Sequence, residues 1–182
     1  MRKHNKSGGL TGLVLMLLLS LPVMAYRNGV TESGPPLIAD IQYELVGQTD
    51  IHWLWVKLYK AELRTASGQY HGQARSLSLE LTYERAFSRE QLITATLKEW
   101  QRQNTDYNPR WLDELQHIWP DIKPKDSLLL FVDDQGHGHF YYNKTLIGAL
   151  KEAVFTQAFI DIWLSENTHQ PASRQQLIGS ES

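Results

Sequence analysis

The alternation of apolar and polar residues along residues 119–165 predicts a definite order of secondary-structure elements. An unbroken apolar run at residues 128–132 predicts a buried strand, and the Asp-Gln-Gly sequence at residues 134–136 predicts a hairpin turn. Two strand-like pieces follow, and apolar residues then recur at helical spacing over residues 151–163. This pattern predicts a small sheet whose final helix covers one of its faces.

Earlier segments predict further strands. Residues 38–46 and 51–64 are rich in β-branched and aromatic residues, and we expect residues 47–50 to separate them. Strict alternation over residues 77–84 predicts a half-buried strand. The links between these strands are of hairpin length, which favours antiparallel pairing.

Capping residues predict three more helices. Ser88 and Gln91 have the spacing of a capping box and predict a helix over residues 89–103. Asn108 followed by Pro109 predicts the next helix, which ends at Pro120, and Pro171 opens a short terminal helix. The predicted class is therefore α+β: an open, mainly antiparallel sheet with helices packed on one face.

The first 25 residues have the three parts of a secretory signal peptide. A basic start with Arg2, Lys3 and Lys6 precedes an apolar stretch over residues 10–21, and Val-Met-Ala ends a cleavage site at residue 25. The apolar stretch is shorter than the roughly 20 residues of a spanning helix. We predict a signal peptide at residues 1–25, a flexible mature N-terminus at 26–36, one domain at 37–182, and export to the periplasm with no later membrane span.

Composition excludes several classes of partner and site. The chain has no cysteine, which removes disulfides and thiolate chemistry. Three of its 18 basic residues lie in the signal peptide and all 20 acidic residues follow it, so the mature chain has a net charge of −5. Nucleic acid and anionic membranes are disfavoured as partners, because both require a basic surface.

Several short motifs resemble the bacterial chalcone isomerase-like family. They are Trp-Pro-Asp-Ile-Lys at residues 119–123, Gly148, and Ile-Trp-Leu-Ser at residues 162–165. The resemblance extends from the strands near residue 40 to Gly179, and it implies an open antiparallel sheet covered by helices. That superfamily includes enzymes, fatty-acid binders and proteins without an assigned activity, so the resemblance leaves the function open.

The chain differs from the plant chalcone isomerases at the residues that carry their chemistry. Those enzymes use an arginine on the strand before the one that aligns with Trp-Val-Lys-Leu-Tyr-Lys here, and this chain has no arginine between Arg27 and Arg64. Lys57 falls near their threonine, Tyr107 near their tyrosine and Thr168 near their last hydroxyl residue. Stabilisation of developing charge can lower a reaction barrier more than any other contribution, so chalcone isomerisation is not expected without that arginine.

Charged side chains on apolar strand faces are the candidate ligand-binding residues. Lys57 lies in a row of aromatic and apolar residues, where it either extends to water or serves as a pocket cation. Arg85 ends the apolar face that includes Tyr83, and it either pairs with a carboxylate or binds an anionic head group. Tyr83 is either a core residue or part of the site.

Other groups predict neither a metal site nor a cofactor. His137 and His139 follow a turn that contains two aspartates, an arrangement that is usually solvated. We therefore expect an exported, non-catalytic protein that binds a small apolar or fatty-acid-like ligand through Lys57, Tyr83 and Arg85. One alternative is an isomerase or lyase acting on a small carbonyl or phenolic compound; another is a partner protein in an envelope complex, for which an exposed aromatic patch would be the sign.

Overall fold

The sheet has six antiparallel strands in sequence order. The computed structural model describes residues 42–180, in which the strands are β1 (Glu44–Trp53), β2 (Val56–Thr65), β3 (Leu77–Tyr83), β4 (Ser127–Val132), β5 (Gly138–Tyr142) and β6 (Thr145–Leu150). Each strand pairs only with its neighbours in sequence, from β1 at one edge to β6 at the other. The predicted open antiparallel sheet is confirmed.

The break expected at residues 47–50 is wrong. β1 continues through these residues, and the chain turns instead at Leu54 and Trp55. Gly47 marks a close contact and not a turn, because a Cβ there would overlap the carbonyl oxygen of Gln176 in the C-terminal helix. The apolar residues of the real turn carry no turn signature, which is why the pattern misplaced it.

Four helices connect and cover the strands: α1 (Arg89–Arg102), α2 (Pro109–Ile118), α3 (Ala153–Leu164) and α4 (Pro171–Leu177). The capping box of Ser88 and Gln91 is present at the start of α1. Asn108 accepts a hydrogen bond from the backbone of Arg110, with Pro109 at the first helical position of α2. These caps satisfy N–H groups that have no partner within the helix, which explains why they located the helices correctly.

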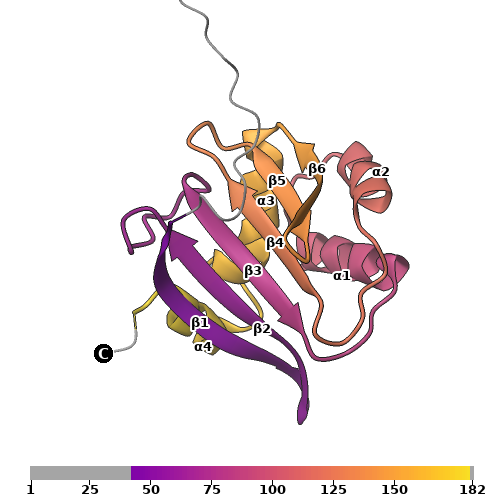
Figure 1. The fold of residues 1–182 in the computed structure, drawn as a ribbon, viewed down its shortest axis with the longest axis horizontal. Helices are drawn as coiled ribbons and strands as arrows, with labels where there is room; N and C mark the ends of the chain where they lie inside the picture. Colours follow the sequence, from indigo (N-terminus) through magenta and orange to yellow (C-terminus); the bar gives the residue numbers. More distant parts are fainter. Residues whose placement is uncertain (1–41, 181–182) are drawn as a thin grey trace, which may run out of the picture. The chain divides into compact units, whose positions relative to one another are not determined.

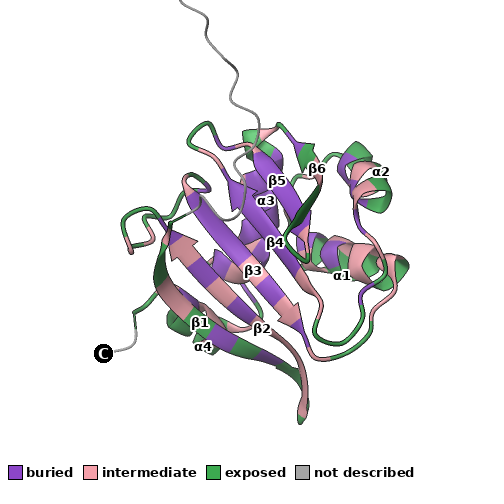
Figure 2. Ribbon diagram, viewed as in Figure 1, coloured by how far each residue is buried: buried purple, intermediate pink, exposed green. Residues whose placement is uncertain are grey.

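All four helices lie on one face of the sheet (Figure 1), as predicted. α4 packs against β1 and β2, α2 against β6, and α1 against both α2 and α3. The central strands are the most buried (Figure 2), because helices cover one face and other strands flank both edges. Apolar residues of β2–β5 face the helices and form one core with them.

The predicted signal peptide and the predicted flexible segment lie outside the described residues. Within residues 42–180, no helix is long and apolar enough to cross a bilayer.

Candidate functional site

A cavity of about 370 Å³ lies between strands β1–β4 and helices α1 and α3. This volume is within the range of small-molecule sites, roughly 300–1,000 Å³. Its lining is mainly apolar and aromatic. The strands contribute Ile51, Leu58, Tyr59, Leu81, Tyr83 and Leu128, and the segments around the helices contribute Phe87, Leu92, Trp119, Phe159, Ile162 and Trp163.

Aromatic rings form the inner wall of this cavity. Phe159 contacts Trp119 and Trp163, with ring centroids 5.7 and 5.4 Å apart. On the sheet, Tyr83 lies between Tyr59 and Phe87, at 5.4 and 5.6 Å. Edge-to-face and tilted contacts of this kind hold rings in place, so the wall is preformed.

Two tyrosines supply hydroxyl groups at this wall. The hydroxyl of Tyr59 accepts a hydrogen bond from the indole nitrogen of Trp163 at 3.0 Å. Burial raises the pKa of Tyr59 to about 12, and burial together with the nearby Tyr59 raises the pKa of Tyr83 further. Both hydroxyls therefore stay protonated near neutral pH and act as neutral hydrogen-bonding groups.

One end of the cavity is polar, although sequence reasoning identified none of its residues. Glu99 of α1 accepts hydrogen bonds from Arg102 at 2.6 Å and pairs with His169 at 2.8 Å. Gln170 follows His169 and also lines the cavity. Since α1 and the α3–α4 loop are some 70 residues apart in sequence, only the packed helices bring these groups together. They can hold the polar head of a ligand whose chain occupies the apolar part.

Lys57 lies away from this cavity because of a β-bulge. Ile51 pairs with Tyr59 and His52 with Lys57, which leaves Leu58 as an extra residue in β2. The extra residue shifts the alternation of faces, so that Leu58 lines the cavity. The Lys57 ammonium instead forms an ion pair with Asp50 at 2.7 Å.

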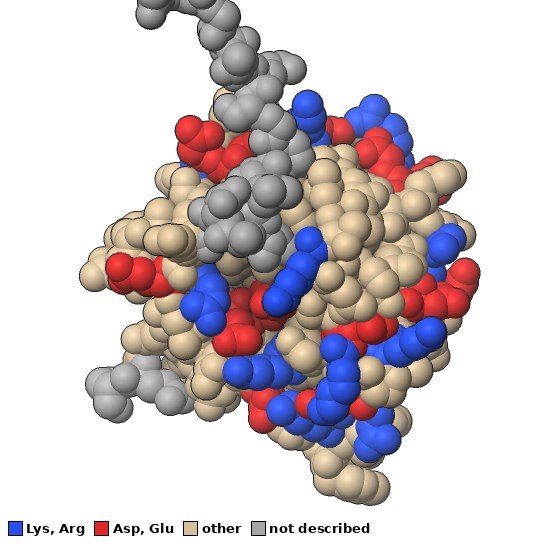
Figure 3. All heavy atoms as spheres, in the orientation of Figure 1, with Lys and Arg blue, Asp and Glu red and all other residues tan. Residues whose placement is uncertain are grey.

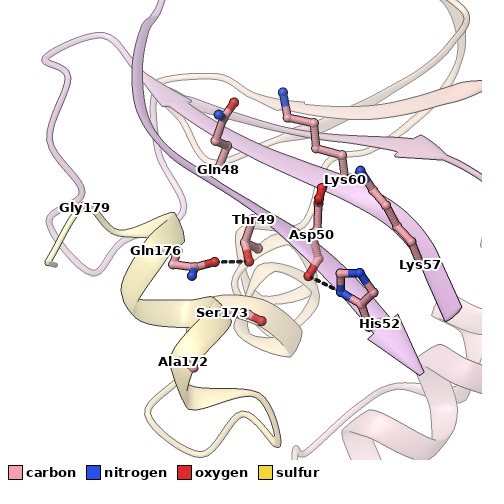
Figure 4. A pocket seen from close by; sticks show the side chains of 10 residues that line it. All are labelled: Gln48, Thr49, Asp50, His52, Lys57, Lys60, Ala172, Ser173, Gln176 and Gly179. Carbon is pink, nitrogen blue, oxygen red and sulfur yellow. Dashed lines mark hydrogen bonds and ion pairs between the residues drawn. The ribbon is translucent and has the colours of Figure 1, made fainter. Parts of the chain in front are cut away.

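Lys57 lines an open, polar groove over the edge strand β1 and helix α4 (Figure 4). Thr49 donates a hydrogen bond to Gln176 there, joining the strand to the helix, and Lys60 and Asp50 also line the groove. A role for Lys57 in ligand binding stays a prediction.

The other predicted residues lie in separate surroundings. Tyr83 lines the cavity, whereas Arg85 is exposed on the loop after β3 and lines none of the described cavities. Tyr107 stacks on Trp100 at 5.5 Å and is not among the residues that line the cavity. Thr168 is buried and donates a hydrogen bond to the carbonyl of Ile162 at the end of α3. The three catalytic candidates Lys57, Tyr107 and Thr168 are therefore not brought into one described cavity.

His137 and His139 both lie beside Asp133, each with a ring nitrogen 3.2 Å from the same carboxylate oxygen. Backbone hydrogen bonds to this carboxylate come from Gln135 and His137 in the β4–β5 turn. Burial opposes ionisation of Asp133, but these hydrogen bonds and the histidines hold its pKa below the ordinary value. The cluster therefore braces a tight turn.

Comparisons with known proteins identify similar sequences and folds. A model of a family described as chalcone isomerase-like matches residues 54–179. An uncharacterized protein of Haemophilus influenzae is 29% identical over 139 residues, which cover 75% of this chain and 68% of that protein. The crystal structure of an Arabidopsis thaliana fatty-acid binding protein is similar in fold, with a TM-score of 0.59 and 12% identity, over 81% of this chain and 91% of that one.

Proposed function

Because the chain belongs to the chalcone isomerase-like family, we propose that it uses this fold to bind a small apolar, fatty-acid-like ligand without catalysing its conversion. The observation that carries the proposal is the apolar cavity of about 370 Å³ with a polar group of residues at one end. An acyl chain would occupy the aromatic part, and its head would lie near His169 and Gln170. The structurally similar Arabidopsis protein, named for fatty-acid binding, supports this ligand class.

The absence of catalysis is proposed from the placement of the candidate groups. Acid-base catalysis needs its groups within hydrogen-bond reach of one substrate. Lys57 is held by Asp50, and the Thr168 hydroxyl is held by the carbonyl of Ile162. The half-buried ring of Tyr107 stacks on Trp100. No observation favours a shared reaction site for these three residues.

The test is a fatty-acid titration of the purified protein and two tryptophan variants. Ala95 lines the cavity from the exposed side of α1, so Ala95→Trp narrows the cavity without disturbing the core. We expect saturated fatty acids to displace a fluorescent fatty acid from the wild type. The affinity should fall about tenfold or more in Ala95→Trp, because the ligand loses apolar burial.

Thr94→Trp is the matched control. Thr94 is the neighbouring exposed residue on the same helix and does not line the cavity. This variant should bind as the wild type does. No displacement from the wild type, or equal losses in both variants, would contradict the proposed function.

We also propose that the protein acts after export to the periplasm. The support is the basic, apolar and small-residue order of residues 1–25, which lie outside the described residues. Mass spectrometry of the protein from the periplasmic fraction of its host should give a chain that starts near Tyr26. An intact leader on cytoplasmic protein would contradict this proposal.

A further inference from the structure

The turn between β1 and β2 exposes three consecutive apolar residues, which we name the hairpin tip: Trp53, Leu54 and Trp55. Their relative exposures are 67%, 67% and 85%. In Figure 1 the tip is the lower end of the indigo hairpin, beyond the neighbouring strands. Other large exposed apolar residues, such as Val154 on α3, are separate from this group. The tip is therefore a concentrated apolar surface at the end of an extended element.

The fold itself gains little from these residues. Leu54 has a φ of 54°, a left-handed conformation that costs a non-glycine residue about 1–2 kcal/mol. Glycine or asparagine would make this turn with less strain, and a polar residue would be better solvated. Apolar side chains in an exposed, strained turn thus indicate contact with something outside the domain.

The size and shape of the tip decide what that contact is. Three side chains of this size offer about 400–600 Å² even when fully covered. A standard protein interface buries about 800 Å² on each partner, so the tip alone is too small for a second copy or a stable protein partner. Tryptophan and leucine on a narrow projection fit the interfacial layer of a bilayer, where indole rings are favoured.

The apolar cavity continues to this tip. Trp53 belongs to the tip and also lines the cavity, as do its neighbours His52 and Leu58. We propose that the hairpin tip inserts into the interfacial layer of a lipid bilayer and places the cavity entrance there. The insertion rests on the tip alone, whereas the transfer of an acyl ligand between bilayer and cavity rests on the proposed function.

Charges at the base of the hairpin indicate which lipids suffice. Lys57 pairs with Asp50, and Lys125 pairs with Glu84, so two of the cations near the tip are largely neutralised, whereas the exposed Arg85 lies beside them. Figure 3 shows Lys and Arg side chains intermixed with Asp and Glu above the uncharged lower end of the molecule. Together with the net charge of −5 of the chain after residue 25, this predicts insertion into zwitterionic bilayers with little dependence on salt.

The absence of cysteine allows a test that follows the tip alone. Leu54→Cys, labelled with an environment-sensitive fluorophore in the full chain, is mixed with phosphatidylcholine vesicles. The emission of this label should shift to the blue as the tip enters the apolar layer. Val154→Cys with the same label is the control, because Val154 is equally exposed but lies on α3.

A second substitution tests the tryptophan. Trp55→Ser in the labelled Leu54→Cys protein should weaken vesicle partition about tenfold, since a large aromatic surface is lost. Trp55 does not line the cavity, so Trp55→Ser in the otherwise unchanged chain should bind fatty acid in solution as the wild type does. Insertion without fatty-acid binding would reject the proposed function and retain the insertion.

Four results would overturn the inference. They are no response of the label at residue 54, an equal response at residue 154, no effect of Trp55→Ser on partition, and a response that depends on protein concentration without vesicles. The last result would assign the tip to contact between two copies of the chain.

Discussion

The interior between sheet and helices is filled on one side and open on the other. The rings of Tyr107, Trp111 and Phe155 surround that of Trp100, with centroids 5.5, 5.9 and 6.4 Å from it, and Trp100 is fully buried. We call these four residues the aromatic cluster. Between β1–β3 and α1, comparable aromatic residues surround a cavity instead. Similar side chains therefore stabilise the fold in one region and form a binding surface in the other.

The comparison shows that aromatic content does not by itself mark a site. In the aromatic cluster, the indole nitrogen of Trp100 donates to the carbonyl of Ala158, so α1 is joined to α3. At the cavity, the equivalent contact between Trp163 and Tyr59 joins α3 to the sheet but leaves space beside it. The bulge at Leu58 and the β1–β2 hairpin line the cavity on its sheet side.

The largest expected effect comes from emptying the aromatic cluster. Trp100→Ala should lower the free energy of unfolding by about 3–5 kcal/mol, because a fully buried indole and its hydrogen bond are lost. Leu92→Ala, at the half-buried wall of the cavity, should cost about 1 kcal/mol, because its side chain already faces open space. Urea unfolding measures both. Equal losses would remove the distinction between the two regions.

Gly47→Ala tests how closely α4 packs against strand β1. A Cβ at residue 47 would overlap the carbonyl oxygen of Gln176 and lie 2.6 Å from that of Leu177. The helix backbone would have to move, so we expect a loss of about 1–3 kcal/mol in thermal or urea unfolding. Gln48→Ala, at the exposed neighbour, should change stability by less than about 0.5 kcal/mol. A neutral Gly47→Ala would show that α4 is not fixed by this contact.

Two tyrosine substitutions distinguish support of the cavity wall from contact with the ligand. Tyr59→Phe removes the acceptor of the Trp163 N–H and should cost about 1–3 kcal/mol of stability. Tyr83→Phe should cost less than Tyr59→Phe, because no such bond to Trp163 is lost, and its effect should appear in fatty-acid affinity. Calorimetric unfolding and ligand titration of both variants separate these outcomes. A larger loss of stability in Tyr83→Phe than in Tyr59→Phe would contradict the role of Tyr59 as the residue that supports the wall.

The smallest effect is expected from a pH-dependent network around Asp126, just before β4, where the backbone of Tyr83 in the cavity wall also bonds. Burial opposes ionisation of Asp126, but hydrogen bonds from Tyr142, Asn143 and the backbone of Lys123 hold its pKa below the ordinary value. Because the pKa of Asp126 is lowered on folding, its ionised carboxylate stabilises the fold fully at pH values above the ordinary pKa of about 4. This stabilisation is lost as the pH falls through the lowered pKa of the folded state.

Asp126→Asn should therefore be less stable than the wild type at neutral pH, and the difference should shrink below pH about 4. Unfolding midpoints measured across acidic pH give the comparison. Asp113→Asn, on the exposed surface of α2, serves as the control. A difference that persists unchanged in acid would show that the hydrogen-bonding geometry of Asp126 matters more than its charge.

Local signals explain which parts of the fold were predictable. The capping box of Ser88, the Asn108–Pro109 start of α2 and the alternation of β3 are all readable within a few residues, and all three are present. The β1–β2 turn was misplaced because Leu54 and Trp55 carry no turn preference, while Gly47 does. Gly47 instead allows close contact with α4, which is about 130 residues away in sequence. A local sequence pattern cannot show such a contact.

The candidate site was predictable only in part, because its residues come from separate elements. Tyr83 was predicted and lies in the cavity wall. Lys57 was placed with the aromatic face by simple alternation, and one extra residue at Leu58 redirected it toward Asp50. Glu99 and His169 had no sequence signal, because their role depends on the contact between them, and they are 70 residues apart in sequence.

The sequence by itself determined the element order, the α+β class and the family, because caps, alternation and short motifs act over a few residues. Tertiary structure alone decided where the interior is filled, which side of the sheet Lys57 serves, and that Trp53 and Trp55 are exposed while Trp111 is buried. The physical reason is that burial and space depend on how distant elements pack, and similar aromatic residues can fill a core, line a cavity or form an exposed tip.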